Sequence, residues 1–186
     1  MPQEDPLKAD HKEVDKILDQ AFAAVERGDK RQTLANLDYL WARLAMHIRA
    51  EHLHLFPVLL QKARDPGLLE RLADVVRRLP DEISTLRRDH DFFVKEIYKD
   101  VNLLRGSEKE KRENVDLDEI HRHLMIIAGR LEVHNRLEEI DVYPLAQALL
   151  TVKEISELEV SMSRELTKLP PRFGNIQFPF RDKIDG

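Results

Sequence analysis

The chain contains no cysteine and no long hydrophobic run. The absence of cysteine excludes disulfide bonds, thiolate zinc sites, cysteine-held iron–sulfur clusters and cysteine nucleophiles. Because no stretch of about 18 apolar residues is present, the sequence predicts no membrane-spanning helix. The acidic start, MPQED, does not resemble a secretory signal, and we therefore expect a cytoplasmic protein.

What the sequence does contain is charge of both signs and eight histidines. Its 186 residues are enough for one domain with its own core. The net charge is only −5 although 35% of the residues are charged. Because acidic residues are interleaved with the basic clusters, we expect no nucleic-acid binding. The sequence also lacks a glycine-rich phosphate loop and a nucleophile-elbow motif.

Apolar residues recur at alternating steps of three and four along four long stretches, at 7–25, 37–58, 83–104 and 117–148. This spacing is typical of one face of an amphipathic helix, and no segment alternates as a strand does. We therefore predict an all-α fold, an antiparallel up-down four-helix bundle with additional short helices. Asp5-Pro6 and Gly28 are predicted to bound the first helix, and breaks are predicted at Pro80 and at 106–114.

The domain organisation follows from a change in composition near the end of the chain. We predict one bundle domain over residues 1–167, with the candidate site within 7–149 and a further amphipathic helix after Thr151. Residues 168–186 are rich in proline and phenylalanine and are expected to form an extended tail. The tail either docks its aromatic side chains on the bundle or binds a partner.

Histidines and carboxylates interrupt the apolar faces at positions that are expected to point inward. They are His11, His47, Glu51, His54, His90, His134, Glu138 and Asp141, and neither lysine nor arginine shares these positions. A buried carboxylate without a partner costs several kcal/mol. Protonated histidines offset that charge only at a desolvation cost of their own. A divalent or trivalent metal ion satisfies imidazole nitrogens and carboxylate oxygens together, so we favour a metal site.

The same motif occurs twice, which strengthens this interpretation. Residues 47–57 (HIRAEHLHLFP) align without a gap with residues 134–144 (HNRLEEIDVYP), and Asp10-His11 matches Asp89-His90. Each copy contains a histidine and a glutamate four residues apart, which lie on one face of a helix. The repeat predicts two helix-pair halves related by a pseudo-twofold axis, each contributing two histidines and one glutamate.

This arrangement closely resembles the hemerythrin-like family, also called the HHE cation-binding domain, over roughly residues 7–149. The resemblance implies a non-haem di-iron centre inside the bundle, with two iron ions bridged by oxygen or hydroxide. Manganese is an alternative for this set of ligands. The resemblance also implies a role for each residue: His11 and His47 bind one metal, His90 and His134 bind the other, and Glu51 and Glu138 bridge the two.

The chain departs from the oxygen-carrying hemerythrins, which place a second histidine one turn from the ligand on the third helix. Leu86 and Val94 stand four residues on either side of His90. The resemblance therefore implies open metal positions and a protein that binds or reacts with O2, NO or peroxide for sensing, detoxification or iron handling. Two alternatives remain: an enzyme that consumes peroxide or NO, and a metal-stabilised regulatory module with a protein partner or a second copy of the chain.

The remaining polar and aromatic residues near the motif have less specific interpretations. His54 and Asp141 are interpreted as a buried histidine–aspartate hydrogen bond, with metal ligation as the alternative. His52 and Glu139 are expected at the rim of the site. His121 and His123 lie too far along the helix to share its metal and are expected at the surface or at the bundle end. Core packing around a dry pocket is expected for Trp41, Phe56, Phe92, Phe93 and Tyr143.

Overall fold

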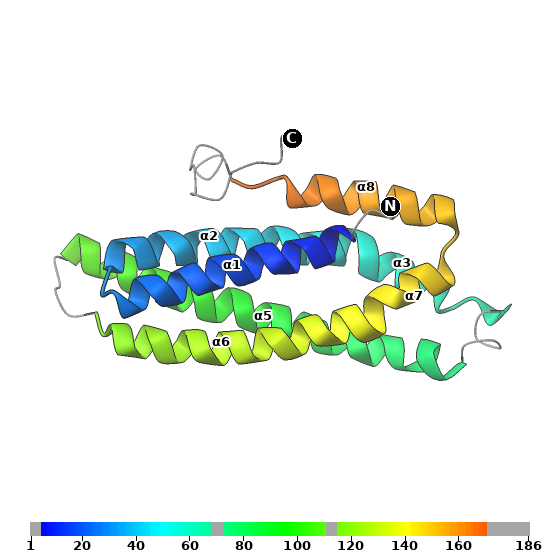
Figure 1. The fold of residues 1–186 in the computed structure, drawn as a ribbon. Helices are drawn as coiled ribbons and strands as arrows, with labels where there is room; N and C mark the ends of the chain where they lie inside the picture. Colours follow the sequence, from blue (N-terminus) through cyan, green and yellow to red (C-terminus); the bar gives the residue numbers. More distant parts are fainter. Residues whose placement is uncertain (1–4, 68–72, 111–114, 171–186) are drawn as a thin grey trace.

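Four long helices run side by side along an elongated bundle (Figure 1). This computed structural model describes residues 5–67, 73–110 and 115–170, within which the chain is helical and contains no strand. The four helices are α1 (Pro6–Glu26), α2 (Lys30–Ala50), α5 (Ala73–Glu110) and α6 (Leu117–Leu137). Because α1 and α5 each contact both α2 and α6, the helices form a closed ring of four. The predicted all-α bundle is confirmed.

The ends of the first two helices follow from local capping chemistry. The Asp5 side chain accepts a hydrogen bond from the amide of Leu7, and Pro6 occupies the first turn of α1. Gly28 has a φ of +70°, which residues with a Cβ rarely adopt, and it reverses the chain after α1. The Asp29 side chain then caps α2. The predicted bounds of the first helix are therefore confirmed.

A π-helical turn follows α2 in the first half and α6 in the second half, and each turn leads into a short helix. These turns are η1 (Glu51–Leu55) and η2 (Glu138–Val142), and they lead into α3 (Phe56–Lys62) and α7 (Tyr143–Leu149). Each turn is followed by an aromatic residue and then by proline, which lacks an amide hydrogen and cannot continue the regular bonding pattern. A π turn adds one residue, so it shifts every later side chain by one position around the helix.

The predicted break at Pro80 is wrong and the predicted break at 106–114 starts too early, because α5 is continuous from Ala73 to Glu110. It runs through Pro80, where Val76, Leu79 and Ile83 are all buried on the bundle side. This packing compensates for the one backbone hydrogen bond that a proline removes. Residues 106–110, predicted as loop, extend the helix and include glutamate and lysine, which favour helix. The remaining predicted loop residues, 111–114, lie outside the described residues.

The bundle core consists of two apolar clusters separated by a layer of polar side chains. Leu7 and Leu86 belong to the cluster at one end, whereas Val14 and Phe93 belong to the cluster at the other. His11 and His90 lie between these pairs on their helices and are buried. The polar layer is therefore enclosed by apolar side chains along the bundle axis.

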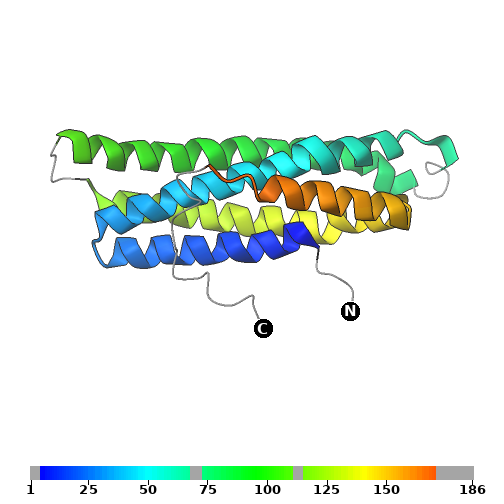
Figure 2. The ribbon, with the colours of Figure 1, turned by 90° about the horizontal axis from the view of Figure 1, so that it is seen from above.

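A fifth long helix, α8 (Val152–Leu166), lies along the outside of the bundle and contacts α1 and α2 (Figure 2). Thr151 caps its start, and the Thr151 side chain forms a capping box with Glu154. The helix expected after this residue is therefore present. Near its end, the buried carboxylate of Glu165 accepts hydrogen bonds from Arg49 on α2 and from Lys168. Residues 171–186 of the predicted tail lie outside the described residues.

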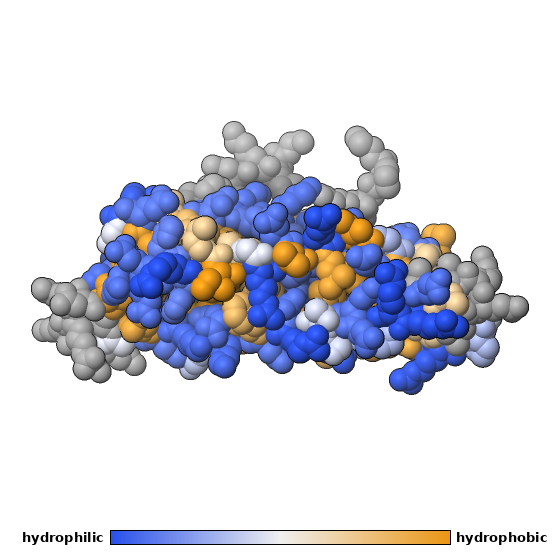
Figure 3. All heavy atoms as spheres, turned by 90° about the horizontal axis from the view of Figure 1, so that it is seen from below, coloured by the Kyte–Doolittle hydropathy of each residue, from blue (hydrophilic) through white to orange (hydrophobic). Residues whose placement is uncertain are grey.

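The face of the molecule seen from below is largely hydrophilic (Figure 3). The outer side of α6 carries exposed apolar side chains, Met125, Ile126 and Val133. Figure 3 views the molecule from below and shows hydrophobic residues as separate orange areas among blue ones. Within the described ranges, none of the helices has the length and apolar character that crossing a membrane requires.

Candidate metal centre

The six residues predicted as metal ligands come together in the polar layer. They come from all four helices of the bundle and from the first residue of each π turn: His11, His47, Glu51, His90, His134 and Glu138. Each is at most 4% exposed, and both glutamates are completely buried. The predicted convergence of the two halves therefore occurs in the structure.

Their ligand atoms form two overlapping groups. Glu51, His90, His134 and Glu138 form one group, and His11 and His47 with Glu138 form the other; in each, the atoms lie within 4.8 Å of one another. Glu138 belongs to both groups: its Oε2 lies 3.1 Å from His11 Nε2 and its Oε1 lies 2.9 Å from His134 Nε2. Glu51 Oε2 lies 3.1 Å from His90 Nε2 and 3.8 Å from His47 Nε2. Both carboxylates therefore stand between the histidine pairs.

The outer nitrogen of each histidine contacts a polar side chain. The Nδ1 contacts are 2.8 Å from His11 to Glu139, 2.9 Å from His47 to Asp10, 2.9 Å from His90 to His52 and 3.4 Å from His134 to Asp89. An acceptor beside Nδ1 places the proton of a neutral imidazole on that nitrogen. The Nε2 lone pairs of His11, His47 and His134 are then directed into the polar layer, as metal ligation requires, and that of His90 is directed there when His52 Nε2 is the acceptor.

Two of these acceptors, Asp10 and Asp89, are themselves held by arginine. Arg43 pairs with Asp10, and Arg130 Nε donates to Asp89 Oδ1 at 2.7 Å. Each arginine stands four residues before the histidine whose ring the aspartate contacts, so the whole arrangement is repeated in both halves. The sequence comparison found the repeated Asp-His pairs, but it assigned no role to the aspartates.

A metal ion fits the polar atoms that the fold leaves without partners. His47 Nε2, Glu51 Oε2 and Glu138 Oε1 are buried and have no hydrogen bond of acceptable geometry. The Nε2 atoms of His90 and His134 are 3.1 Å apart. Ligand atoms that share one ion at about 2.1 Å in an octahedral arrangement lie about 3 Å apart. The spacing and the donor types therefore both suit a shared cation.

The two buried glutamates also strongly favour positive charge on the groups around them. Burial lowers the pKa of His11, but the hydrogen bond and charge of Glu138 outweigh it and raise that pKa to about 9. Burial likewise opposes the charged form of His90, whose pKa is raised to about 9 by Glu138 and Glu51. Burial raises the pKa of Glu138, but His134 and His11 hold it well below its usual value. The layer thus favours ionised carboxylates facing a cation.

Comparison with known families identifies this architecture. The hemerythrin HHE cation-binding domain family matches residues 4–146, which is most of the chain. The chain belongs to this family. Neither the curated proteins nor the solved structures gave a significant match. The match includes all six residues in the polar layer, and an HHE domain with a buried histidine–glutamate cluster is a metal-binding helical domain.

Tyr143 is the residue of this HHE domain whose place the sequence did not reveal, since only core packing was expected of it. Its hydroxyl lies 2.9 Å from Glu51 Oε1, 3.1 Å from Glu138 Oε2 and 3.3 Å from His11 Nε2. The π turn brings it there, because Tyr143 follows Glu138 by five residues and still shares its face. The equivalent residue in the other half, Phe56, stacks on His90 instead and has no hydroxyl.

The same π turns make the expectation for His54 and Asp141 wrong. Leu55 and Val142 take the buried positions one residue later, and both polar residues are only partly buried. The His54 side chain is 29% exposed, and its Nε2 lies 3.8 Å from Glu165 Oε2 on α8. Regular helical spacing placed His54 on the inward face, whereas the extra residue in η1 turns it toward α8.

The other histidines and aromatic residues lie close to where the sequence placed them. His52 and Glu139 are partly buried neighbours that contact the Nδ1 atoms of His90 and His11. His121 packs against Phe22, and His123 contacts Asp100 on α5, both away from the polar layer. Phe56 and Phe93 are fully buried on either side of the layer, whereas Trp41 and Phe92 are partly buried.

Proposed function

We propose that this HHE domain holds two iron ions in the polar layer and there binds or reacts with O2, NO or peroxide. The observation that carries the proposal is the convergence of four imidazole Nε2 atoms on two completely buried carboxylates. One of these nitrogens, His47 Nε2, and one oxygen of each carboxylate, Glu51 Oε2 and Glu138 Oε1, lack a hydrogen bond of acceptable geometry, so the unloaded layer is electrostatically incomplete. Imidazole with carboxylate suits iron, and manganese is the alternative ion.

The assignment of ligands follows the two groups of atoms. We assign His11 and His47 to one ion and His90 and His134 to the other, with Glu51 and Glu138 between them. Glu138 presents a different oxygen to each half, at 3.1 Å from His11 and 2.9 Å from His134. In Glu51 one oxygen faces both histidine pairs, while the other accepts a hydrogen bond from Tyr143. Glu138 is thus the better placed bridging residue.

The chain's own residues supply the environment for this chemistry. Bound iron supplies one-electron redox chemistry and coordination positions that the protein leaves open. The apolar clusters above and below the layer exclude water. The Tyr143 hydroxyl is a hydrogen-bond donor inside the layer, and burial together with the charges of Glu138 and Glu51 raises its pKa well above the usual value. The Nδ1 partners hold the four rings in place.

Anaerobic loading with ferrous iron, followed by exposure to each small ligand, tests this function. We expect an iron-dependent visible spectrum that changes on addition of O2, NO or peroxide. Repeated consumption of NO or peroxide by the same protein would identify an enzyme. Stoichiometric binding would identify a sensor or carrier. A fully iron-loaded protein whose spectrum responds to none of the three ligands would contradict the proposal.

A further inference from the structure

Two surface grooves reach the metal centre, and the internal repeat relates them. The groove between α2 and α5 has a volume of about 410 Å³ and is lined in part by His52 and His90. The groove between α1 and α6 has a volume of about 440 Å³ and is lined in part by Glu139 and His11. His52 aligns with Glu139 in the repeat, and His90 aligns with His11. Each groove therefore leads to a histidine from a different pair.

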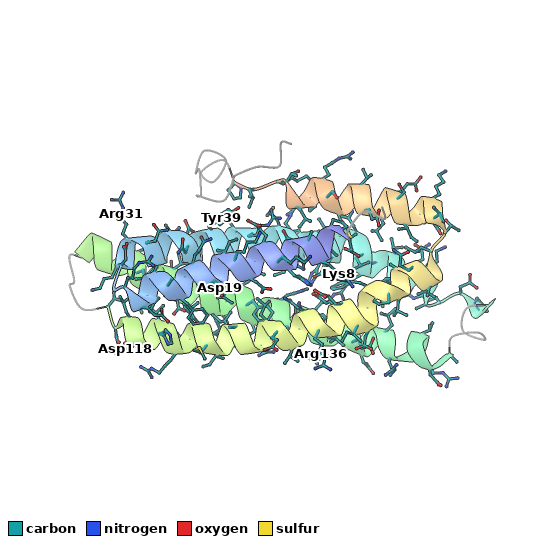
Figure 4. All side chains as sticks on the ribbon, in the orientation of Figure 1. Lys8, Asp19, Arg31, Tyr39, Asp118 and Arg136 are labelled. Carbon is teal, nitrogen blue, oxygen red and sulfur yellow. The ribbon has the colours of Figure 1, made fainter. Side chains whose placement is uncertain are left out.

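The linings of the two grooves differ in chemical character at the positions that the repeat aligns. Four residues of the α2/α5 groove are aromatic or aliphatic, namely Trp41, Ile48, Val94 and Tyr98. At the positions that align with them, the α1/α6 groove has Ala128, Asn135, Asp15 and Asp19. Asp19 on α1 and Arg136 on α6, which also lines this groove, are labelled in Figure 4. The α1/α6 groove is also lined by Leu18, Leu131 and Ile140, but it carries more charged side chains than its counterpart, so the α2/α5 groove is the more apolar of the two.

The apolar groove ends one imidazole ring away from the polar layer. His52 Nε2 lies 2.9 Å from His90 Nδ1, while His90 Nε2 faces the layer at 3.1 Å from Glu51 Oε2. Asp91 and Lys95, both exposed, complete the lining.

We propose that the α2/α5 groove is the site where a small uncharged apolar molecule collects before it reaches the His90 side of the centre. The ligand class is a diatomic gas, so the inference rests on the proposed function and adds a route to it. An apolar solute gains free energy by leaving water for an apolar surface. The charged side chains of the α1/α6 groove retain their hydration, because displacing that water for an apolar solute is unfavourable.

Xenon in the metal-free chain provides a test that does not depend on iron. Xenon is an uncharged apolar probe, and its position is located in crystals of the full chain under xenon pressure. We expect xenon in the α2/α5 groove. Xenon found only in the α1/α6 groove, or in neither groove, would overturn the proposal. Because no metal is involved, this result stands even if the protein fails to load iron, which would contradict only the proposed function.

Two matched substitutions test the route in the iron-loaded protein. Val94→Phe narrows the apolar groove, and Ala128→Phe adds the same side chain to the other groove. We expect the association rate of NO to fall about tenfold in the Val94 variant, because the larger side chain hinders entry through the groove. The Ala128 variant is expected to keep the wild-type rate, with equal iron content in all three proteins. Equal slowing in both variants, or an unchanged rate in Val94→Phe, would overturn the route. Ile48→Phe replaces Val94→Phe if circular dichroism shows that the latter is unfolded.

Discussion

The two halves of the bundle build the same inner set of atoms and surround it differently. Each half supplies two histidines, one glutamate, an aspartate–arginine pair and a π turn. Around these, Tyr143 in the second half corresponds to Phe56 in the first, and Glu139 corresponds to His52. The repeated part is therefore the part that holds the proposed metals, and the differing part is what a bound ligand would meet.

This difference makes the two proposed metal positions chemically unequal. The position near His11 has a tyrosine hydroxyl 3.3 Å from the ring and an acidic outer partner in Glu139. The position near His90 has a stacked phenylalanine and the imidazole of His52 as its outer partner. A carboxylate beside Nδ1 makes the imidazole more electron-donating than a neutral ring does. We therefore expect different affinities at the two positions, and the following predictions test this inequality.

The largest expected effect is a difference between the two buried glutamates. Glu138→Gln removes the carboxylate that faces both histidine pairs through separate oxygens, so we expect both ions to be lost. Glu51→Gln leaves Glu138 in place, and we expect one ion to be retained. Metal analysis after anaerobic reconstitution measures this difference. If the two variants lose the same amount of iron, the two carboxylates are equivalent and this part of the comparison is wrong.

The next effect concerns the aspartates behind the histidines. Asp10→Asn and Asp89→Asn weaken the hold on the rings of His47 and His134, and we expect metal affinity to fall about 10–100-fold. The loss is expected to be larger for Asp10, whose side chain is completely buried, than for Asp89 at 12% exposure. Competition with a chelator gives the affinities. Asp118→Asn, at an exposed position of α6, is the matched control and should leave affinity unchanged.

A smaller effect is expected from giving position 143 the residue that its counterpart in the first half, Phe56, already has. Tyr143→Phe removes a donor from the fully buried carboxylates, which should lower the free energy of unfolding of the metal-free protein by about 1–3 kcal/mol. Urea denaturation with a chelator present measures the change. Tyr98→Phe removes a hydroxyl from an exposed side chain and serves as the control. An unchanged free energy of unfolding in Tyr143→Phe would show that the hydroxyl does not stabilise the carboxylates.

The smallest effect concerns α8, which contacts α1, α2 and η1 of the first half. Hydrogen bonds from Lys168 and Arg49 lower the pKa of Glu165 to about 2, below its usual value of 4.5. Because the folded-state pKa is the lower one, the stabilisation is complete above about pH 4.5 and is lost as the pH falls toward 2.

Glu165→Gln should remove about 1 kcal/mol of stabilisation of α8 at neutral pH, since the hydrogen-bonding partners of Glu165 are half exposed. Hydrogen exchange in α8 measures this loss, with the exposed Glu157→Gln as control. Equal hydrogen-exchange protection of α8 in both variants would contradict the predicted role of Glu165.

Helical spacing was sufficient to place the six residues of the polar layer, because each lies in a regular helix or at the first residue of a π turn. Beyond Glu51 and Glu138 the spacing failed, since a π turn adds a residue that periodicity does not reveal. That single cause explains both the misplaced His54 and Asp141 and the unexpected position of Tyr143. The repeated proline that follows each aromatic residue was the available signal, because it disfavours the regular turn.

Residues that act through another side chain were the hardest to find from sequence. Asp10 and Asp89 were visible only as a repeated pair of letters, since their role depends on contacts with helices far away in the chain. The continuity of α5 through Pro80 likewise depends on packing by neighbouring helices rather than on local preference. Tertiary contacts determine both the role of the aspartates and the continuity of α5, and a single sequence does not show these contacts directly.

An anaerobic titration of the metal-free protein with ferrous iron tests the central claim most directly. We predict saturation at about two ions per chain, a count set by the two groups of ligand atoms. The double variant His47→Ala with His134→Ala should lose this iron binding. Binding of fewer than one ion for every two chains, or an unchanged titration in the double variant, would contradict the claim that the polar layer is a two-metal site.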